Sequence, residues 1–320
     1  MVKSMSTPTT FVPLGPARAT SIDAPTLGPV LSFKLVLVAL FWGGTFISGK
    51  ILAQQLPPMT AAFCRFLVAA VLLVLVAFRI DGGLPRLSRS QLLCTASMGL
   101  TGILLYNLCF FTALAHIPAG RTALFVSLTP IVTALMASLV FRERLGAMRW
   151  MGIGVALIGA LIVITRGDLA SALQDISGSI GTGEVLMSLA VVNWAAYTLI
   201  SRKTAESLSP IAATTYATLW GLAFISLGAV GEFRSIQWTT LGWQVWSSIL
   251  YLGAIGTVVA FIWYQQGIRS VGPSRTAVFT NLVPAFGVLL SAVLLGEQVL
   301  ASMLIGGAVS VVGVSLTNRK

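Results

Sequence analysis

One ionisable residue of this sequence lies well inside a long apolar stretch: Arg65, about six residues into the segment 59–78. At the rise of 1.5 Å per helical residue this is a depth of roughly 9 Å, where a guanidinium is a functional candidate and could bind a carboxylate. The long side chain could instead reach back to the edge of the apolar layer. Arg65 is therefore a candidate for substrate binding, for gating or for a structural role.

Aromatic and amide side chains are also placed within apolar segments. Trp42 and Trp194 lie near the middle of two of them, not at the ends where interfacial aromatics gather. A buried indole needs a hydrogen-bond acceptor or must face a cavity. Each such residue could simply join two helices by a hydrogen bond worth about 0.6 kcal/mol. Together with Trp42 and Trp194, the following residues predict an aromatic, uncharged binding pocket: Tyr106, Asn107, Asn193, Tyr197 and Tyr264.

Two prolines, Pro130 and Pro284, lie inside apolar segments. A proline donates no hydrogen bond to the carbonyl four residues earlier, so a helix is weakened there. Such carbonyls are tolerated in a membrane where they face protein or a wet cavity. Ser127 and Asn281, about one turn away, could line that cavity. The alternatives are kinks that bend during gating and kinks that serve packing alone.

Several residue types are scarce. No Asp or Glu falls in the middle of an apolar segment, which argues against a carrier of organic cations or one with a deeply buried proton-carrying carboxylate. Three dispersed cysteines, Cys64, Cys94 and Cys109, and the single histidine His116 predict no metal site. No phosphate-binding glycine loop occurs outside an apolar span, so we expect no cofactor.

The composition places these residues in a membrane. Hydrophobic residues make up 56% of the 320 residues and charged residues 9%, against about 25% charged in a soluble domain. The net charge of +11 is dispersed, which disfavours nucleic-acid binding. Apolar stretches near the 20-residue spanning length predict an all-α membrane protein. We expect ten transmembrane helices, near 33–53, 59–78, 91–115, 121–141, 149–165, 184–201, 209–231, 243–268, 274–296 and 299–317.

The basic residues predict the orientation. With ten spans, the 20 Lys and Arg residues divide into fifteen on the side of the termini, four on the other, and Arg65 within a span. Loops rich in Lys and Arg stay in the cytoplasm, so we expect both termini there and a multi-pass protein of the bacterial inner membrane. The polar residues 1–30 are expected to form a disordered cytoplasmic tail.

An internal repeat divides the chain. At an offset of 154 residues, RTALFVSLTP (Arg121 to Pro130) aligns with RTAVFTNLVP (Arg275 to Pro284), and twelve of 39 pairs are identical over positions 121–159. Glu143 and Glu297 are equivalent and are expected to cap or pair at the interface. Five helices per repeat is odd, so the second copy enters the membrane inverted, as in many secondary transporters. We expect repeats at 31–166 and 184–320, joined by an extracytoplasmic linker at 167–183.

The last helix of each repeat carries small residues at close spacing, which suits tight packing or a homodimer through helices five and ten. These residues are Gly152, Ala156 and Gly159 in the first repeat, and Gly306, Ser310 and Gly313 in the second.

The sequence resembles the EamA-type members of the drug/metabolite transporter superfamily. The resemblance covers nearly all of the chain from Leu31 to Asn318 and rests on FWGGTF, CRFLVAA, LYNLCFFTALAHIPAGRTALFVSLTPIVTALMASLVFRERL and GPSRTAVFTNLVPAFGVLLSAVLLGEQV. It implies a ten-helix bundle with a central cavity lined mainly by helices 1–4 and 6–9. Many members carry an arginine at the position of Arg65 whatever their substrates, which favours a structural or gating role there.

We therefore expect a secondary transporter that works by alternating access and exports a small metabolite such as an amino acid, with the lipid bilayer and a small-molecule substrate as its partners. Efflux of drugs or other toxic compounds is an alternative. A non-transporting scaffold or sensor is a further one, although no long soluble domain favours it. A membrane enzyme is disfavoured because acidic or histidine clusters are missing.

Overall fold

The computed structural model describes residues 28–141, 146–165, 167, 181–204, 207–271 and 279–317. Most of the predicted N-terminal tail, 1–30, and most of the predicted linker lie outside these residues, and the last two residues of the predicted tail belong to the first helix. Within the described ranges every regular element is helical. This confirms the predicted all-α class.

The first half contains five helical segments, two of them composite. Their bounds are α1 (Pro29–Gln55), α2 (Pro58–Ile80), α3 (Arg89–Met98) continued by a π-helical stretch (Gly99–Leu105) and α4 (Tyr106–His116), α5 (Ala119–Phe125) continued by a 3-10 turn (Val126–Leu128) and α6 (Thr129–Phe141), and α7 (Ala147–Ile164).

The second half follows the same plan. Its helices are α10 (Thr182–Thr204), α11 (Pro210–Phe233), α12 (Trp243–Leu250) continued by a π-helical stretch (Tyr251–Val259) and α13 (Ala260–Val271), α15 (Leu282–Leu295) and α16 (Ala301–Thr317), with a short 3-10 turn (Trp238–Thr240) before α12.

Seven helical segments of the described chain are long and apolar enough to cross a membrane, and three shorter apolar helices, Trp150–Val163, Leu282–Leu295 and Ala301–Gly313, accompany them. These are the ten segments that the sequence predicts. Most ends agree with the predicted ones to within four residues; α1 starts four residues earlier, because Pro29 provides a first-turn proline that needs no backbone donor.

Local sequence explains several helix ends. Ser88 and Gln91 form a reciprocal capping box at the start of α3, and the Ser209 hydroxyl accepts from the Ala212 amide at 3.0 Å at the start of α11. At the end of α15, Gly296 has a φ of +67°, a left-handed conformation that glycine adopts without steric cost.

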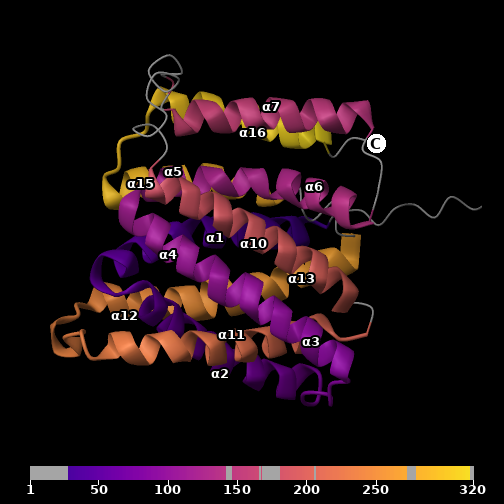
Figure 1. Cartoon of the computed structure of the whole chain (residues 1–320), viewed down its shortest axis with the longest axis vertical. Helices are drawn as coiled ribbons and strands as arrows, with labels where there is room; N and C mark the ends of the chain where they lie inside the picture. The colour runs from indigo at the N-terminus through magenta and orange to yellow at the C-terminus, as the bar shows by residue number, and fades with distance from the viewer. Residues whose placement is uncertain are drawn as a thin grey trace, which may run out of the picture.

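The helices pack in a pattern that repeats when the two halves are exchanged. Helix α1 of the first half packs on α15 and α13 of the second half, and α10 of the second half packs on α6 and α4 of the first half. The self-equivalent pairs are α2 with α11 and α7 with α16, which lie along opposite edges of the molecule (Figure 1). The two π-helical stretches, Gly99–Leu105 and Tyr251–Val259, contain Gly99 and Gly253, which are 154 residues apart as the repeat predicts.

The predicted small-residue faces of helices five and ten meet each other inside one chain. A Cβ at Gly159 would lie 2.5 Å from the Gly306 carbonyl oxygen, and one at Gly313 would lie 2.3 Å from the Ala156 nitrogen. The Ser310 hydroxyl donates to the Ala156 carbonyl at 3.3 Å. Close packing of α7 on α16 uses these residues, and a homodimer through the two helices stays a prediction.

Candidate functional site

An aromatic cluster lies where the two halves meet. The Trp194 ring lies 5.1 Å from Tyr106, 5.0 Å from Tyr197 and 6.4 Å from Phe261, measured between ring centroids. The Trp42 ring lies 5.8 Å from the same Phe261 and 5.1 Å from Tyr264. We call these six residues the aromatic cluster; the two tryptophans, equivalent in the repeat, both contact Phe261.

The tryptophans are partly exposed within the bundle, and the polar edge of Trp42 makes a hydrogen bond. The Trp42 indole donates from Nε1 to the Gly256 carbonyl at 3.1 Å, an acceptor inside the second π-helical stretch. Trp42, Tyr106, Trp194, Phe261 and Tyr264 are all half-buried, whereas Tyr197 is buried. The cluster therefore presents ring surface that protein atoms do not fully cover.

Arg65 lies beside this cluster, buried in α2 with 9% of its surface exposed. It donates from Nη1 to the Asn107 side-chain amide oxygen, Oδ1, at 3.0 Å and from Nη2 to the Thr257 hydroxyl at 3.4 Å. Asn107 belongs to the first half and directly follows Tyr106, and Thr257 belongs to the second half. The guanidinium thus joins both halves and does not reach back to the edge of the apolar layer.

Asn107 and Thr257 are oriented by the π-helical stretches. The Asn107 amide donates from Nδ2 to the Ile103 carbonyl at 2.8 Å, which turns its oxygen toward Arg65. The Thr257 hydroxyl donates to the carbonyl of Leu252, five residues earlier, at 2.8 Å and so accepts from Arg65. π-Helical turns inside α-helices are rare and often occur at functional sites.

The helix interruptions near the two prolines coincide with the repeat. Ahead of Pro130, the Val126 carbonyl accepts from the Thr129 amide in a 3-10 turn, which replaces the bond that proline cannot make. At the equivalent place α15 begins after Asn281, and Pro284 is buried in its first turn. A gating role for these positions stays a prediction.

Three predicted polar residues lie outside the aromatic contacts. The Ser127 hydroxyl donates to its own helix at the Leu124 carbonyl, 2.7 Å away. The Asn193 amide likewise donates to the Leu189 carbonyl at 2.9 Å. Asn281 is half-buried at the interruption before α15. Among the interactions described above, these residues do not join the Arg65 contacts.

Two residues of the site are missing from the sequence-based set. Phe261 contacts both tryptophans, and Thr257 accepts from Arg65. A signal for Phe261 was available, because it is the repeat equivalent of Asn107 at the offset of 154 residues. Threonine is common in apolar helices, so Thr257 carried no comparable signal.

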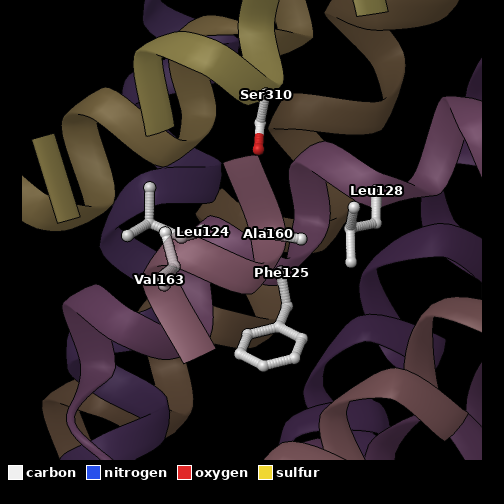
Figure 2. Close-up of a pocket in the computed structure, with 6 residues that line it drawn as sticks. All are labelled: Leu124, Phe125, Leu128, Ala160, Val163 and Ser310. Atoms are coloured by element: carbon white, nitrogen blue, oxygen red, sulfur yellow. The ribbon is translucent and has the colours of Figure 1, made fainter. Parts of the chain in front are cut away.

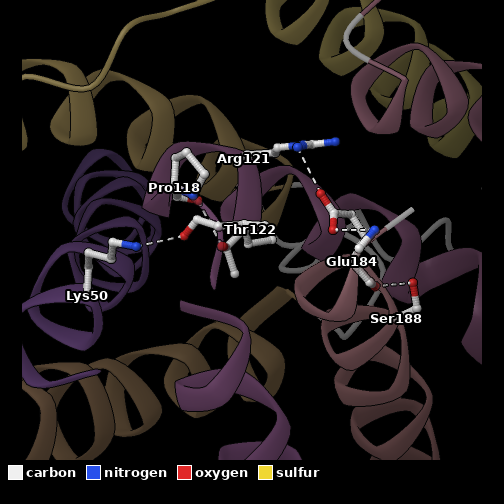
Figure 3. A network of polar contacts seen from close by, with 8 residues as sticks. Lys50, Pro118, Arg121, Thr122, Glu184 and Ser188 are labelled. Carbon is white, nitrogen blue, oxygen red and sulfur yellow. Dashed lines mark hydrogen bonds and ion pairs between the residues drawn. The ribbon is translucent and has the colours of Figure 1, made fainter. Parts of the chain in front are cut away.

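A polar network holds one end of the bundle together (Figure 3). Lys50 donates to the Leu114 and Ile117 carbonyls at 2.5 and 3.0 Å, satisfying acceptors at the end of α4. Arg121 forms a buried ion pair with Glu184 at 2.8 Å, joining α5 to α10. Glu297 caps α5 by accepting from the Ala119 and Gly120 amides at 2.8 and 3.0 Å. The capping predicted for Glu297 is thus present, while Glu143 lies outside the described residues.

A small apolar pocket lies away from the cluster (Figure 2). Its lining residues come from α5 and the turn after it, α7 and α16: Leu124, Phe125, Leu128, Ala160, Val163 and Ser310. It offers no charged group, and the Ser310 hydroxyl already donates to α7. We assign it to packing between α5, α7 and α16.

Apolar spanning helices, halves that pack on one another in an exchanged pattern and a partly exposed aromatic site between them define a polytopic membrane transporter. The chain belongs to the EamA-like transporter family, which matches it over residues 31–165 and 181–319. It is a transporter and not an enzyme, which confirms the predicted family and class.

Similar proteins carry transporter names. An uncharacterized transporter, YyaM, of Bacillus subtilis is 27% identical over 86% of this chain and 89% of its own. A probable amino-acid metabolite efflux pump of Salmonella typhimurium is 29% identical over 87% and 90%, respectively. A probable terminal-alkyne amino-acid exporter of Streptantibioticus cattleyicolor is 24% identical over 90% and 93%. One solved crystal structure covers 90% of this chain and 94% of its own with a TM-score of 0.59 and 19% identity, a likeness of fold.

Proposed function

We propose that this protein is a secondary transporter that exports a small metabolite such as an amino acid across the bacterial inner membrane. The observation that carries the proposal is the convergence of Trp42 and Trp194, one from each half, on Phe261. A ligand held there would contact both halves, so movement of one half against the other would change the side from which it is reached. The two exporter names among similar proteins support the direction and the substrate class.

The end network supports a gate at one side. In the proposed orientation Lys50, Arg121, Glu184 and Glu297 face the extracytoplasmic side, and their bonds join α1, α4, α5, α10 and the segment after α15 there. Opening that side requires these bonds to break or rearrange, while the helix interruptions near Pro130 and Pro284 would supply the bending. The repeats 31–166 and 184–320 would be the moving units.

Efflux of toxic compounds is the second candidate, because an aromatic surface also suits drug-like molecules. Described acidic residues occur only at or near helix ends, as Asp81, Glu184, Glu232 and Glu297. A substrate cation would find no carboxylate beside the aromatic cluster among them. This favours substrates without a net positive charge over cationic drugs.

The test measures flux in proteoliposomes that contain the purified full-length protein. Labelled amino acids, amino-acid amides and lipophilic cations are compared for wild type, Trp194→Ala and Trp150→Ala. Trp150 lies on the surface of α7 with 56% of its side chain exposed and serves as the matched control. We expect the wild type to transport at least one amino acid. This flux should fall several-fold in Trp194→Ala and stay at the wild-type level in Trp150→Ala. Flux of no compound in the panel would contradict transport of these classes.

A further inference from the structure

Two arginines are buried in the described part of the chain, and only one has a carboxylate beside it. Arg121 is 5% exposed and pairs with Glu184 at 2.8 Å. Arg65 is 9% exposed, and within the described ranges no Asp or Glu lies within ion-pair distance of it. Burying a charge without a counter-charge costs free energy, so the burial of Arg65 must be offset by another interaction or serve a function.

The donors of Arg65 are incompletely used. A guanidinium has five N–H groups. Nη1 and Nη2 each make one hydrogen bond, to Asn107 and Thr257, and both acceptors are neutral. Nε is buried and has no partner among the described atoms. Neutral acceptors orient the guanidinium and its Cζ lies 5.0 Å from the centroid of the Phe66 ring, but none of these described contacts supplies a negative charge.

The position of Arg65 links it to the aromatic cluster. Its partner Asn107 adjoins Tyr106, whose ring lies 5.1 Å from Trp194. Its partner Thr257 adjoins Gly256, whose carbonyl accepts from the Trp42 indole. A group held at Arg65 would therefore lie between the two halves, on residues that directly adjoin Tyr106 of the aromatic cluster and the Gly256 acceptor of Trp42.

We propose that Arg65 binds the carboxylate of the transported substrate, while the aromatic cluster contacts the apolar remainder of the molecule. This inference rests on the proposed function and narrows it to substrates that carry a carboxylate. Planar carboxylates accept two parallel N–H bonds from one guanidinium, a geometry that an ammonium cannot reproduce. No covalent step is involved, and the substrate supplies the missing negative charge only while it is bound.

The experiment compares acid and amide forms of one compound. Proteoliposome uptake is measured for phenylalanine and N-acetylphenylalanine, which carry the carboxylate, and for phenylalaninamide and N-acetylphenylalaninamide, which do not. Wild type is expected to favour each acid over its amide. Arg65→Gln is expected to lose about tenfold or more of the acid flux and to keep amide flux within about twofold, since a hydrogen-bonded charge is worth about 1.5–3 kcal/mol.

If Arg65 had only a structural role, its replacement would lower acid and amide flux equally. Two further variants separate the guanidinium from its neighbours. Thr257→Val removes one neutral acceptor and leaves the guanidinium, so the acid-to-amide ratio should stay as in wild type even if total flux falls. Arg65→Lys keeps the charge and loses the fork, and we expect an intermediate ratio. If Arg65→Gln does not insert into membranes, the ratios of wild type and of Arg65→Lys decide the matter.

The outcomes separate the two proposals. Equal acid and amide flux in wild type, or equal loss of both in a folded Arg65→Gln protein, overturns the carboxylate assignment and leaves transport intact. Absence of flux for all four compounds and for the wider panel above contradicts the proposed function itself.

Discussion

At the scale of single residues, a buried charge without a carboxylate partner distinguishes the site from the rest of the described chain. The sequence alone indicated Arg65 because it lies deep in an apolar segment, and indicated Trp42 and Trp194 because they lie away from the segment ends. It could not indicate Thr257 or the neutral character of both Arg65 acceptors. Those depend on which helices meet, and short-range pattern does not encode such contacts. Of the other predicted pocket residues, Tyr264 and Tyr197 contact the tryptophans, whereas Asn193 hydrogen-bonds within its own helix.

The Arg121–Glu184 ion pair gives a prediction at this scale. Glu184→Gln removes the carboxylate 2.8 Å from a buried guanidinium, and we expect a loss of stability of about 3 kcal/mol. The measurement is thermal unfolding of the purified protein in detergent. A lower Tm in Glu184→Gln, and partial recovery in the double variant Arg121→Met with Glu184→Leu, is the expected result. An unchanged Tm in the single variant would show that the pair does not hold α5 to α10.

The cluster geometry gives a second residue-scale prediction. A Cβ at Gly102 would lie 2.3 Å from Cδ2 of Tyr197, the ring that stacks on Trp194. Gly102→Ala should therefore displace Tyr197 and raise KM for the transported amino acid. Gly154→Ala, where no atom lies within 4 Å of the new Cβ, is the control. Equal KM values for wild type and Gly102→Ala would exclude Tyr197 from the substrate contacts.

At the scale of elements, apolar length and small-residue spacing predict the helices better than they predict breaks within them. The ten segments agree with expectation, because spanning length is fixed by the bilayer. The π-helical stretches Gly99–Leu105 and Tyr251–Val259 were not anticipated. Both contain a glycine that meets a neighbouring helix closely: a Cβ at Gly99 would lie 2.7 Å from the Gly221 nitrogen, and one at Gly253 would lie 2.9 Å from the Arg65 carbonyl oxygen. Such approaches are tertiary contacts and leave no periodic signal.

The packing of α7 on α16 is testable by one methyl group. In Gly159→Ala the added Cβ would lie 2.5 Å from backbone atoms of α16, which must move apart. We expect destabilisation by about 1–3 kcal/mol, the usual cost of overpacking. Gly154→Ala on the same helix should be neutral or slightly stabilising. Unfolding of both variants in one detergent measures the difference, and equal stability would contradict close packing of these two helices.

At the scale of the whole molecule, the proposed transport depends on how the two repeats pack on one another and on their orientation in the membrane. The repeat could be read from the sequence because RTALFVSLTP and RTAVFTNLVP keep their spacing from the glycines before them. The pairing of α1 with α15 and of α10 with α6 and α4 could not, since an inverted repeat permits several arrangements. The asymmetry that a specific substrate needs comes from unequal partners in the repeat, such as Asn107 against Phe261 and Arg65 against Ala217.

Orientation in the membrane can be measured with two exposed positions. In a variant with Cys64, Cys94 and Cys109 replaced, we introduce either Arg86→Cys, in the segment between α2 and α3, or Gln298→Cys, in the segment between α15 and α16. The distribution of Lys and Arg predicts that a membrane-impermeant maleimide labels only Gln298→Cys in intact cells. Both should react after permeabilisation. The reverse pattern would place the termini outside and turn the end network toward the cytoplasm.

We propose that one site between two moving halves serves both faces of the membrane, and a counterflow experiment tests this. Proteoliposomes are loaded with a high concentration of unlabelled substrate and diluted into a trace of the labelled compound. A carrier that exposes one site alternately must exchange the two, so labelled substrate should accumulate transiently above its equilibrium level, and Arg65→Gln should abolish this overshoot for carboxylate substrates. A monotonic approach to equilibrium, equal with and without internal substrate, would contradict alternating access.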